Sequence, residues 1–200
     1  MYSNLVDKKI AMREGFNTEL FREVASDIDL ELEASVDFWT GTTMKRFYNY
    51  FLICTEGWRK LCMRGNNSDI DVLNVFKTFC IYIGKGQGDR ALQHLREAIN
   101  KNINNDKVEK IRQVWKEGGG IIICKFFMDS TSYEASTREA IMIDYIGLEH
   151  ATNERHGTYY GHVDRWETAK LYNMGAYYTQ EGIAEIVRRR PTVFLKTDIV

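Results

Sequence analysis

One carboxylate in this 200-residue sequence stands where a helix should carry only apolar side chains. In the stretch TREAIMIDYIGL, which has helical spacing, the neighbours of Glu139 on its own face are Ala135, Met142, Ile143 and Ile146. A carboxylate in such surroundings must be paired with a base, hydrogen-bonded, protonated or bound to a cation. Two interpretations stay open, an internal salt bridge to Arg or Lys and a cation site.

A glycine-rich segment, FCIYIGKGQGDRALQHL (79–95), is the second candidate. Its GKGQG fits neither G-x-G-x-x-G nor G-x-x-x-x-G-K-[ST], so a turn or a close backbone approach explains the glycines better than nucleotide binding does. The helix that follows should begin at Asp89 and carry Arg90, His94 and Glu97 on one side. Its apolar side should consist of Leu92, Leu95 and Ile99.

A polar loop, HATNERHGTYYG (150–161), comes directly after the helix that carries Glu139. Its Asn153, Tyr159 and Tyr160 are compatible with turn formation and packing alone. Three histidines recur every six residues, but a zinc site is not indicated because no cysteine pair or HExxH motif accompanies them: His150, His156 and His162. Glu134 and Arg138, four residues apart, are expected to form an ordinary surface pair.

The elements that must position these residues follow from propensity and periodicity. Aromatic and β-branched runs predict strands at 46–54, 77–84 and 120–128. Helical patterns predict one or two acidic helices in 16–39, a short helix in the connection 55–75, and helices at 89–103, 106–120, 133–149, 165–178 and 179–190. The last of these stops at Pro191, the only proline.

Composition limits the classes of protein that fit. The length and the 44% of hydrophobic residues suit one compact unit. No apolar run approaches the roughly 20 residues of a membrane span, and the start lacks the pattern of a signal peptide. Four cysteines lie far apart without a CxxC pair. We therefore expect an intracellular protein in a reducing compartment, nuclear or cytoplasmic, that does not act at a membrane.

Charge is distributed unevenly although the net charge is only −1. Residues 1–40 hold nine acidic and four basic residues, whereas 85–125 hold nine basic and five acidic ones. The basic region, which includes Lys85 and Lys107, either binds phosphates or forms a solvated helix face. The acidic N-terminal segment is a candidate surface for a protein partner.

Taken jointly, these segments resemble the GIY-YIG nuclease family over about residues 46–165. The matching order is NYFLI, YIGKGQGDRALQHL, REA with Glu139 and TN with Asn153. The first motif reads YNY in place of GIY, which puts Tyr50 at the family's tyrosine with Tyr48 as the alternative, and thirty-one residues separate Tyr50 from Tyr82. The sequences YIGKG, WKEGGG, TREAIMIDYIGL and TNERHGTYYG are similar to the branch found in ankyrin-repeat and LEM-domain endonucleases.

The resemblance implies an α+β fold with a central three-stranded antiparallel sheet flanked by helices. We expect three parts: a helical N-terminal extension (1–45), the nuclease domain (46–165) and a C-terminal helical extension (166–200) packed on the same core.

The resemblance also implies a metal-dependent endonuclease that hydrolyses phosphodiester bonds in branched or distorted DNA. Glu139 would hold one Mg²⁺ or Mn²⁺, and Arg90 would stabilise charge on the phosphate. Tyr50 would be the general base, with a pKa lowered by Lys85 or Arg90. Tyr82 and His94 would orient water or phosphate. The remaining predicted contacts to substrate are Gly84, Gly86, Lys107 and Asn153, the last of which would support the site structurally.

Two other interpretations stay open. The first is a catalytically silent module that binds nucleic acid or protein, in which the glycines form a turn and Glu139 is salt-bridged. The second is a nucleotide-binding protein or transferase. The oligomeric state cannot be inferred from the sequence.

Overall fold

The computed structural model describes residues 29–34, 44–63, 69–161, 163, 166–189 and 191–199. Of the acidic helices predicted in 16–39, only residues 29–34 belong to the described part, and they are helical. The rest of that prediction lies outside the described residues.

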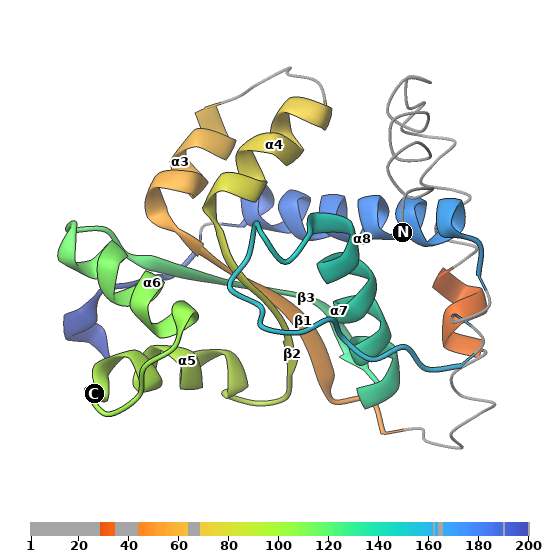
Figure 1. The fold of residues 1–200 in the computed structure, drawn as a ribbon, viewed down its shortest axis with the longest axis horizontal. Helices are drawn as coiled ribbons and strands as arrows, with labels where there is room; N and C mark the ends of the chain where they lie inside the picture. The colour runs from red at the N-terminus through yellow and green to blue at the C-terminus, as the bar shows by residue number, and fades with distance from the viewer. Residues whose placement is uncertain are drawn as a thin grey trace.

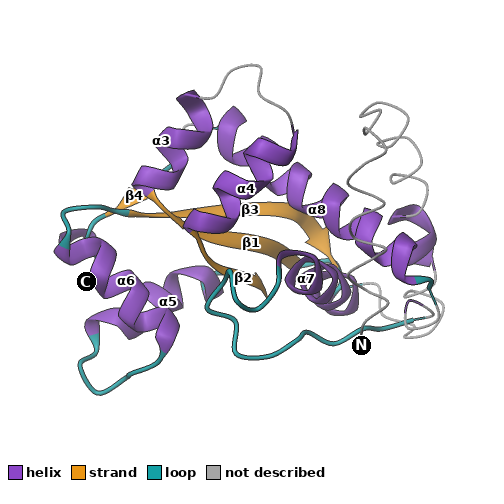
Figure 2. Cartoon of the chain, turned by 45° about the horizontal axis from the view of Figure 1, so that its top comes forward, coloured by secondary structure: helices purple, strands orange, loops and turns teal. Residues whose placement is uncertain are grey.

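The centre of the fold is an antiparallel sheet (Figures 1 and 2). In the described part of the chain it has four strands in the order β2-β1-β3-β4. Their bounds are β1 Phe47–Cys54, β2 Cys80–Gly86, β3 Ile121–Ser130 and β4 Val193–Phe194. The predicted α+β fold with three antiparallel strands is confirmed, and the two-residue β4 adds to it by pairing with Ile121 and Ile122.

Besides the helical residues 29–34, six α-helices surround this sheet in the described part of the chain. They are α3 Thr55–Met63, α4 Asp69–Phe79, α5 Arg90–Ile99, α6 Asp106–Lys116, α7 Ser132–Ile146 and α8 Thr168–Arg188. A short 3-10 helix, Lys196–Asp198, follows β4. The connection between the first two strands therefore holds two helices where one was predicted, and α4 continues to Phe79, so that β2 begins at Cys80 and not at residue 77.

The C-terminal region is one continuous helix, and the prediction of two helices was wrong. Two glycines inside α8 allow it to lie close to its neighbours. A Cβ on Gly175 would be 2.4 Å from Cβ of Tyr145, and one on Gly182 would be 2.3 Å from a ring atom of Phe51. Packing against α7 and the sheet thus keeps the helix continuous through two glycines, although glycine has a low helix propensity.

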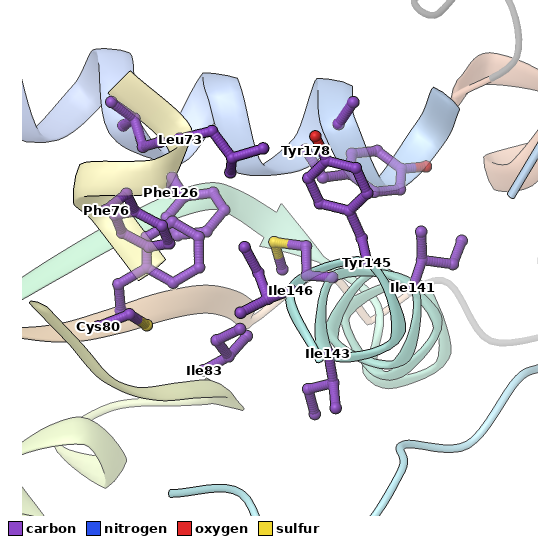
Figure 3. Packing of buried hydrophobic residues seen from close by; sticks show 14 of the residues in the cluster. Leu73, Phe76, Cys80, Ile83, Phe126, Ile141, Ile143, Tyr145, Ile146 and Tyr178 are labelled. Atoms are coloured by element: carbon purple, nitrogen blue, oxygen red, sulfur yellow. The ribbon is translucent and has the colours of Figure 1, made fainter. Parts of the chain in front are cut away.

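Two layers of buried side chains cover the two faces of the sheet, as the period of two along β1 requires. Phe51 and Ile53 face α4, α7 and α8. Figure 3 shows part of this layer, where side chains from four elements meet: Leu73, Phe76, Phe126, Ile146 and Tyr178. Tyr48, Tyr50 and Leu52 face the opposite layer, which α5 and α6 cover.

Helix α7 is buried around most of its circumference, and this overturns the expected surface pair of Glu134 and Arg138. Glu134 closes a capping box with Thr131 at the start of the helix. The Arg138 side chain is only 2% exposed and forms ion pairs with Asp29 (3.0 Å) and Glu33 (2.9 Å). The acidic side chains of residues 29–34 therefore face basic residues of their own chain, and a partner for the N-terminal segment stays a prediction.

Two further findings concern the cysteines and the helices of the described residues. All four cysteines are free thiols, and three of them lie in strands: Cys54, Cys80 and Cys124. Within the described ranges, no helix has both the length and the apolar character that crossing a membrane requires.

Candidate active site

The outer edge of β2 is where the predicted site residues are anchored. The backbone N–H of Thr152 donates to the carbonyl of Ile81 (2.8 Å). The Asn153 side chain accepts from Ile83 N–H (3.1 Å) and donates to Ile83 C=O (2.8 Å), so its amide takes the place of a neighbouring strand. Two residues further along, the N–H of Lys85 donates to Glu139 Oε1 (3.1 Å). Asn153 thus closes part of the outer edge of β2, and its role in supporting a reaction stays a prediction.

Glu139 lies at this edge and opens into a cleft of about 520 Å³, which Tyr82, Lys107 and Asn153 also line. Burial raises the pKa of its carboxyl to about 7, against the opposing effect of Lys85 and Arg90. Among the described residues, no basic side chain lies within ion-pair distance of this carboxylate. The salt-bridge interpretation of Glu139 is therefore not what the structure contains.

The surroundings of Glu139 fit a hard divalent cation. The carboxylate is held in place by a backbone N–H, and its negative charge is incompletely balanced by the protein. Within the described ranges, no group of three or more His, Cys, Asp or Glu side chains is placed to hold a metal. A cation at Glu139 would therefore keep most of its ligands as water or substrate oxygens, which is how Mg²⁺ is commonly bound.

Tyr50 and His94 form the second feature of the site. The phenol oxygen lies 2.6 Å from His94 Nε2, and both side chains are buried. Burial, with Lys107 nearby, lowers the pKa of His94 to about 4, so the ring is neutral at pH 7. Its Nδ1 lies 3.2 Å from Glu97 Oε2.

The expectation that cations lower the pKa of Tyr50 was wrong for the free protein. Burial raises the pKa of its phenol well above the usual value, and the neighbouring Tyr82 and Glu139 act in the same direction. Arg90 does act to lower it, but more weakly than burial raises it. Tyr50 is therefore a protonated phenol whose oxygen faces a neutral imidazole.

The structure also separates the two tyrosines that compete for the first motif. Tyr48 donates to the carbonyl of Gly88 (2.8 Å), and Lys125 Nζ donates to the same oxygen (3.1 Å). Tyr48 therefore fixes the turn before α5, whereas Tyr50 contacts His94. This arrangement favours Tyr50 as the reactive tyrosine.

The glycines of YIGKG have a packing reason. Gly84 pairs with Tyr50 across β1 and β2, and a Cβ there would be 2.4 Å from Cζ of the Tyr50 ring. A Cβ on Gly86 would be 2.7 Å from Cβ of Arg90. The backbone of β2 thus leaves space for a tyrosine ring and for the first turn of α5. Contact of either glycine with substrate stays a prediction.

The basic residues of the region line two cavities: Lys107 shares a cleft with Glu139, and Lys85 and Arg90 line another cavity. Lys85 Nζ donates to Ser136 Oγ (2.5 Å), and Lys85, Gly86 and Arg90 line a second cavity of about 540 Å³. Lys107 Nζ stands 4.9 Å from the centre of the Tyr82 ring and 3.4 Å from Glu97. Burial lowers the pKa of both Lys85 and Lys107. All ten residues predicted for the site therefore lie in one region of the molecule.

One residue of this region had no predicted role. Glu97 faces His94, Lys107 (3.4 Å) and Arg90 (3.9 Å) at once. The sequence did indicate that Glu97 belongs to this region, because helical spacing placed Arg90, His94 and Glu97 on one side of the helix. What the sequence concealed is that His94 is buried. The buried residues of α5 are Ala91, His94, Leu95 and Ala98, whereas Ile99, expected on the apolar side, is 38% exposed. Asp89 precedes α5 without capping it through its side chain.

The recurrent histidines do not gather in the described part of the chain. His150 pairs with Glu149, and His156 lies 2.5 Å from Asp144. His162 lies outside the described residues.

Comparisons with known proteins agree with this geometry. The family model described as the LEM-3-like GIY-YIG domain matches residues 47–199. The chain is similar to ankyrin repeat and LEM domain-containing protein 1 of Mus musculus, with 30% identity over 151 residues that cover 72% of this chain and 28% of the relative. For the Homo sapiens protein the identity is 27% over 148 residues, covering 70% and 24%.

A more distant relative is the Caenorhabditis elegans homolog of the same protein, 24% identical over 131 residues that cover 61% of this chain and 18% of the relative. The chain thus spans about a quarter of the length of the curated relatives it matches, or less. No solved structure gives a significant match.

Proposed function

The chain belongs to the LEM-3-like GIY-YIG domain family, and from this membership we propose that it is a divalent-metal-dependent endonuclease that hydrolyses phosphodiester bonds in DNA. Branched or otherwise distorted DNA is the proposed substrate. The observation that carries the proposal is Glu139, a partly buried carboxylate without a basic partner among the described residues, held by Lys85 N–H beside the Tyr50–His94 pair.

Mg²⁺ or Mn²⁺ held by Glu139 would supply positive charge to the scissile phosphate and the leaving oxygen. Arg90 is half exposed at the first turn of α5, and its contact with Glu97 (3.9 Å) is longer than a hydrogen bond, so its guanidinium can donate to non-bridging phosphate oxygens. Lys85 lines the same cavity as Arg90 and adds a second positive charge there. Together they stabilise the charge that builds up on the phosphate during cleavage.

Tyr50 would pass a proton from the attacking water to His94, because its raised pKa disfavours a free phenolate that could act as the base alone. As the attacking water gives a proton to the phenol oxygen, the phenol gives its own proton to His94 Nε2, 2.6 Å away. The hydroxide forms the new P–O bond as the bond from phosphorus to the leaving oxygen breaks. The leaving oxygen takes a proton from solvent water, and His94 then releases its own proton to solvent, so that the site returns to its starting state. The negative phosphate favours this transient imidazolium, as does Glu97 on the other side of the ring.

The proposal is tested by incubating the purified protein with linear, flapped and four-way-junction DNA, with Mg²⁺, Mn²⁺ or EDTA. Cleavage of the flapped or four-way substrate is expected, and EDTA, Glu139→Gln and Arg90→Ala should each abolish it without unfolding the protein. Glu154→Gln is the matched control, because Glu154 is an exposed carboxylate that lines the same cleft and should be dispensable.

Two outcomes would contradict the proposal. Undiminished cleavage by Glu139→Gln would remove the metal assignment. Binding of DNA without cleavage in Mg²⁺ or Mn²⁺ would instead identify a catalytically silent binding module of the same fold.

Several finer statements stay predictions. They are the division into 1–45, 46–165 and 166–200, a protein partner for the N-terminal segment, and a nuclear or cytoplasmic location in a reducing compartment.

A further inference from the structure

We propose that Glu97 is a positioning residue for the reaction: it fixes the tautomer of His94 so that Nε2 accepts the Tyr50 proton, and it holds Lys107 and Arg90 until the phosphate arrives. This inference rests on the proposed endonuclease function. It assigns a role to a carboxylate that would not itself touch the reacting atoms.

The position of the proton on His94 depends on the contacts of its two ring nitrogens. A neutral imidazole carries one N–H, and the hydrogen bonds of its two nitrogens decide which nitrogen holds it. Glu97 Oε2, 3.2 Å from Nδ1, is part of a carboxylate that accepts but does not donate, so Nδ1 carries the hydrogen. Nε2 is then left with a lone pair facing the Tyr50 phenol at 2.6 Å.

The surroundings of the ring leave Glu97 as the group that selects this tautomer. His94 contacts Tyr50 of β1, Tyr82 of β2 and Glu97 of its own helix. Arg90 and Lys107 act on it electrostatically. The two cations disfavour a charged ring, and the tyrosines contact it with their rings or through Nε2. Within this group, only Glu97 lies at Nδ1 as an obligatory acceptor.

Glu97 also contacts two cations. Glu97 Oε2 lies 3.4 Å from Lys107 Nζ, and Oε1 lies 3.9 Å from a guanidinium nitrogen of Arg90. Neutralising Glu97 would release both cations from this carboxylate. DNA binding should then be as tight as before or tighter, even though the proton relay is impaired.

The substitution should therefore impair turnover while it preserves or improves binding of DNA, a combination that a merely structural residue would not produce. In Glu97→Gln we expect kcat to fall about 10- to 100-fold, as when a residue that orients a histidine is removed, with KM for DNA unchanged or lower. A rise in KM together with the fall in kcat would overturn the proposal, because it would indicate general damage to the site.

A measurement independent of activity decides the tautomer. ¹⁵N NMR of the histidine side chains should show His94 protonated at Nδ1 in the wild-type protein, with the signal assigned by its loss in His94→Gln. In Glu97→Gln the Nδ1–H form should lose its preference, since a glutamine side chain both donates and accepts. Nε2–H in the wild-type protein, or an unchanged tautomer in Glu97→Gln, would contradict the proposal.

Two further variants keep the test sharp. Lys107→Gln removes a cation that contacts Glu97 and should leave the tautomer unchanged. Glu109→Gln is the matched control on α6, because its exposed carboxylate pairs with Arg112 and should affect neither kcat, KM nor the tautomer. If wild-type protein cleaves no DNA at all, the endonuclease function fails, whereas the NMR result still decides the role of Glu97.

Discussion

His94 is a buried titratable side chain, and this gives the stability of the protein a defined pH dependence. Its pKa is about 4 in the folded protein, against an ordinary value of 6.5. Between these two pH values the unfolded chain binds a proton that the folded chain does not, so acid favours unfolding.

We therefore expect the free energy of unfolding to fall as the pH is lowered from about 6.5 to about 4, by up to about 1.4 kcal/mol per pH unit from this residue. Urea denaturation of the wild-type protein and of His94→Gln at several pH values measures the effect. The difference between the two proteins isolates His94, because other groups such as Glu139 are present in both. A difference that does not change with pH would contradict the burial of a neutral His94.

At the scale of single residues, the sequence was informative where a residue type conflicted with its surroundings. Glu139 stood out because its helical neighbours are apolar, and the structure places it at the mouth of the cleft. The state of Tyr50 could not be predicted, because its raised pKa depends on burial that three separate elements create. Glu97 was found on the correct side of its helix, but its contacts with Lys107 belong to tertiary packing.

Between elements, the approach of β1 to β2 depends on the absence of a side chain at Gly84. In Gly84→Ala, the added Cβ would meet the Tyr50 ring at 2.4 Å and push the phenol away from His94. We expect a loss of about 1–3 kcal/mol in the free energy of unfolding and a fall in cleavage rate greater than this instability explains. Thermal unfolding and cleavage assays on the same samples measure both.

Gly118→Ala is the control for this prediction. Gly118 has φ 79° and open space around it, so alanine there costs about 1 kcal/mol of backbone strain and should leave cleavage unchanged. A Gly84→Ala protein that is equally stable and active would mean that the ring has room to move.

The strands were the easiest elements to predict, because β1, β2 and β3 are dense in aromatic and β-branched residues. The boundary between α4 and β2 was harder, since KTF at residues 77–79 suits either element and packing decides between them. The continuity of α8 depends on contacts of Gly175 and Gly182 with Tyr145 and Phe51, which are distant in sequence. Propensity alone therefore predicted a break where none exists.

Across the whole molecule, Arg138 joins the N-terminal segment to the helix of the site. It lies one residue before Glu139 and pairs with Asp29 and Glu33, more than 100 positions earlier in the chain. Its guanidinium also lies 4.9 Å from the centre of the Phe127 ring.

Because removing one partner of a buried ion pair leaves the other charge uncompensated, Arg138→Ala should lower the free energy of unfolding by about 3–5 kcal/mol. Arg188→Ala, which removes an exposed arginine from its pair with Glu185, should have an effect below about 1 kcal/mol. Urea denaturation of both variants makes the comparison, and similar effects would show that the Arg138 pairs contribute little.

The hydrogen bonds of the Asn153 amide also bear on the tendency of the protein to aggregate. Thr152, Asn153 and Glu139 occupy the backbone hydrogen-bonding groups of Ile81, Ile83 and Lys85 that face outward from β2. An outer strand left open is a template on which another chain extends the sheet. The residues proposed to support the active site thus also block pairing of β2 with another copy of the chain. A substitution that removes the Asn153 hydrogen bonds to Ile83 should therefore favour aggregation as well as loss of activity.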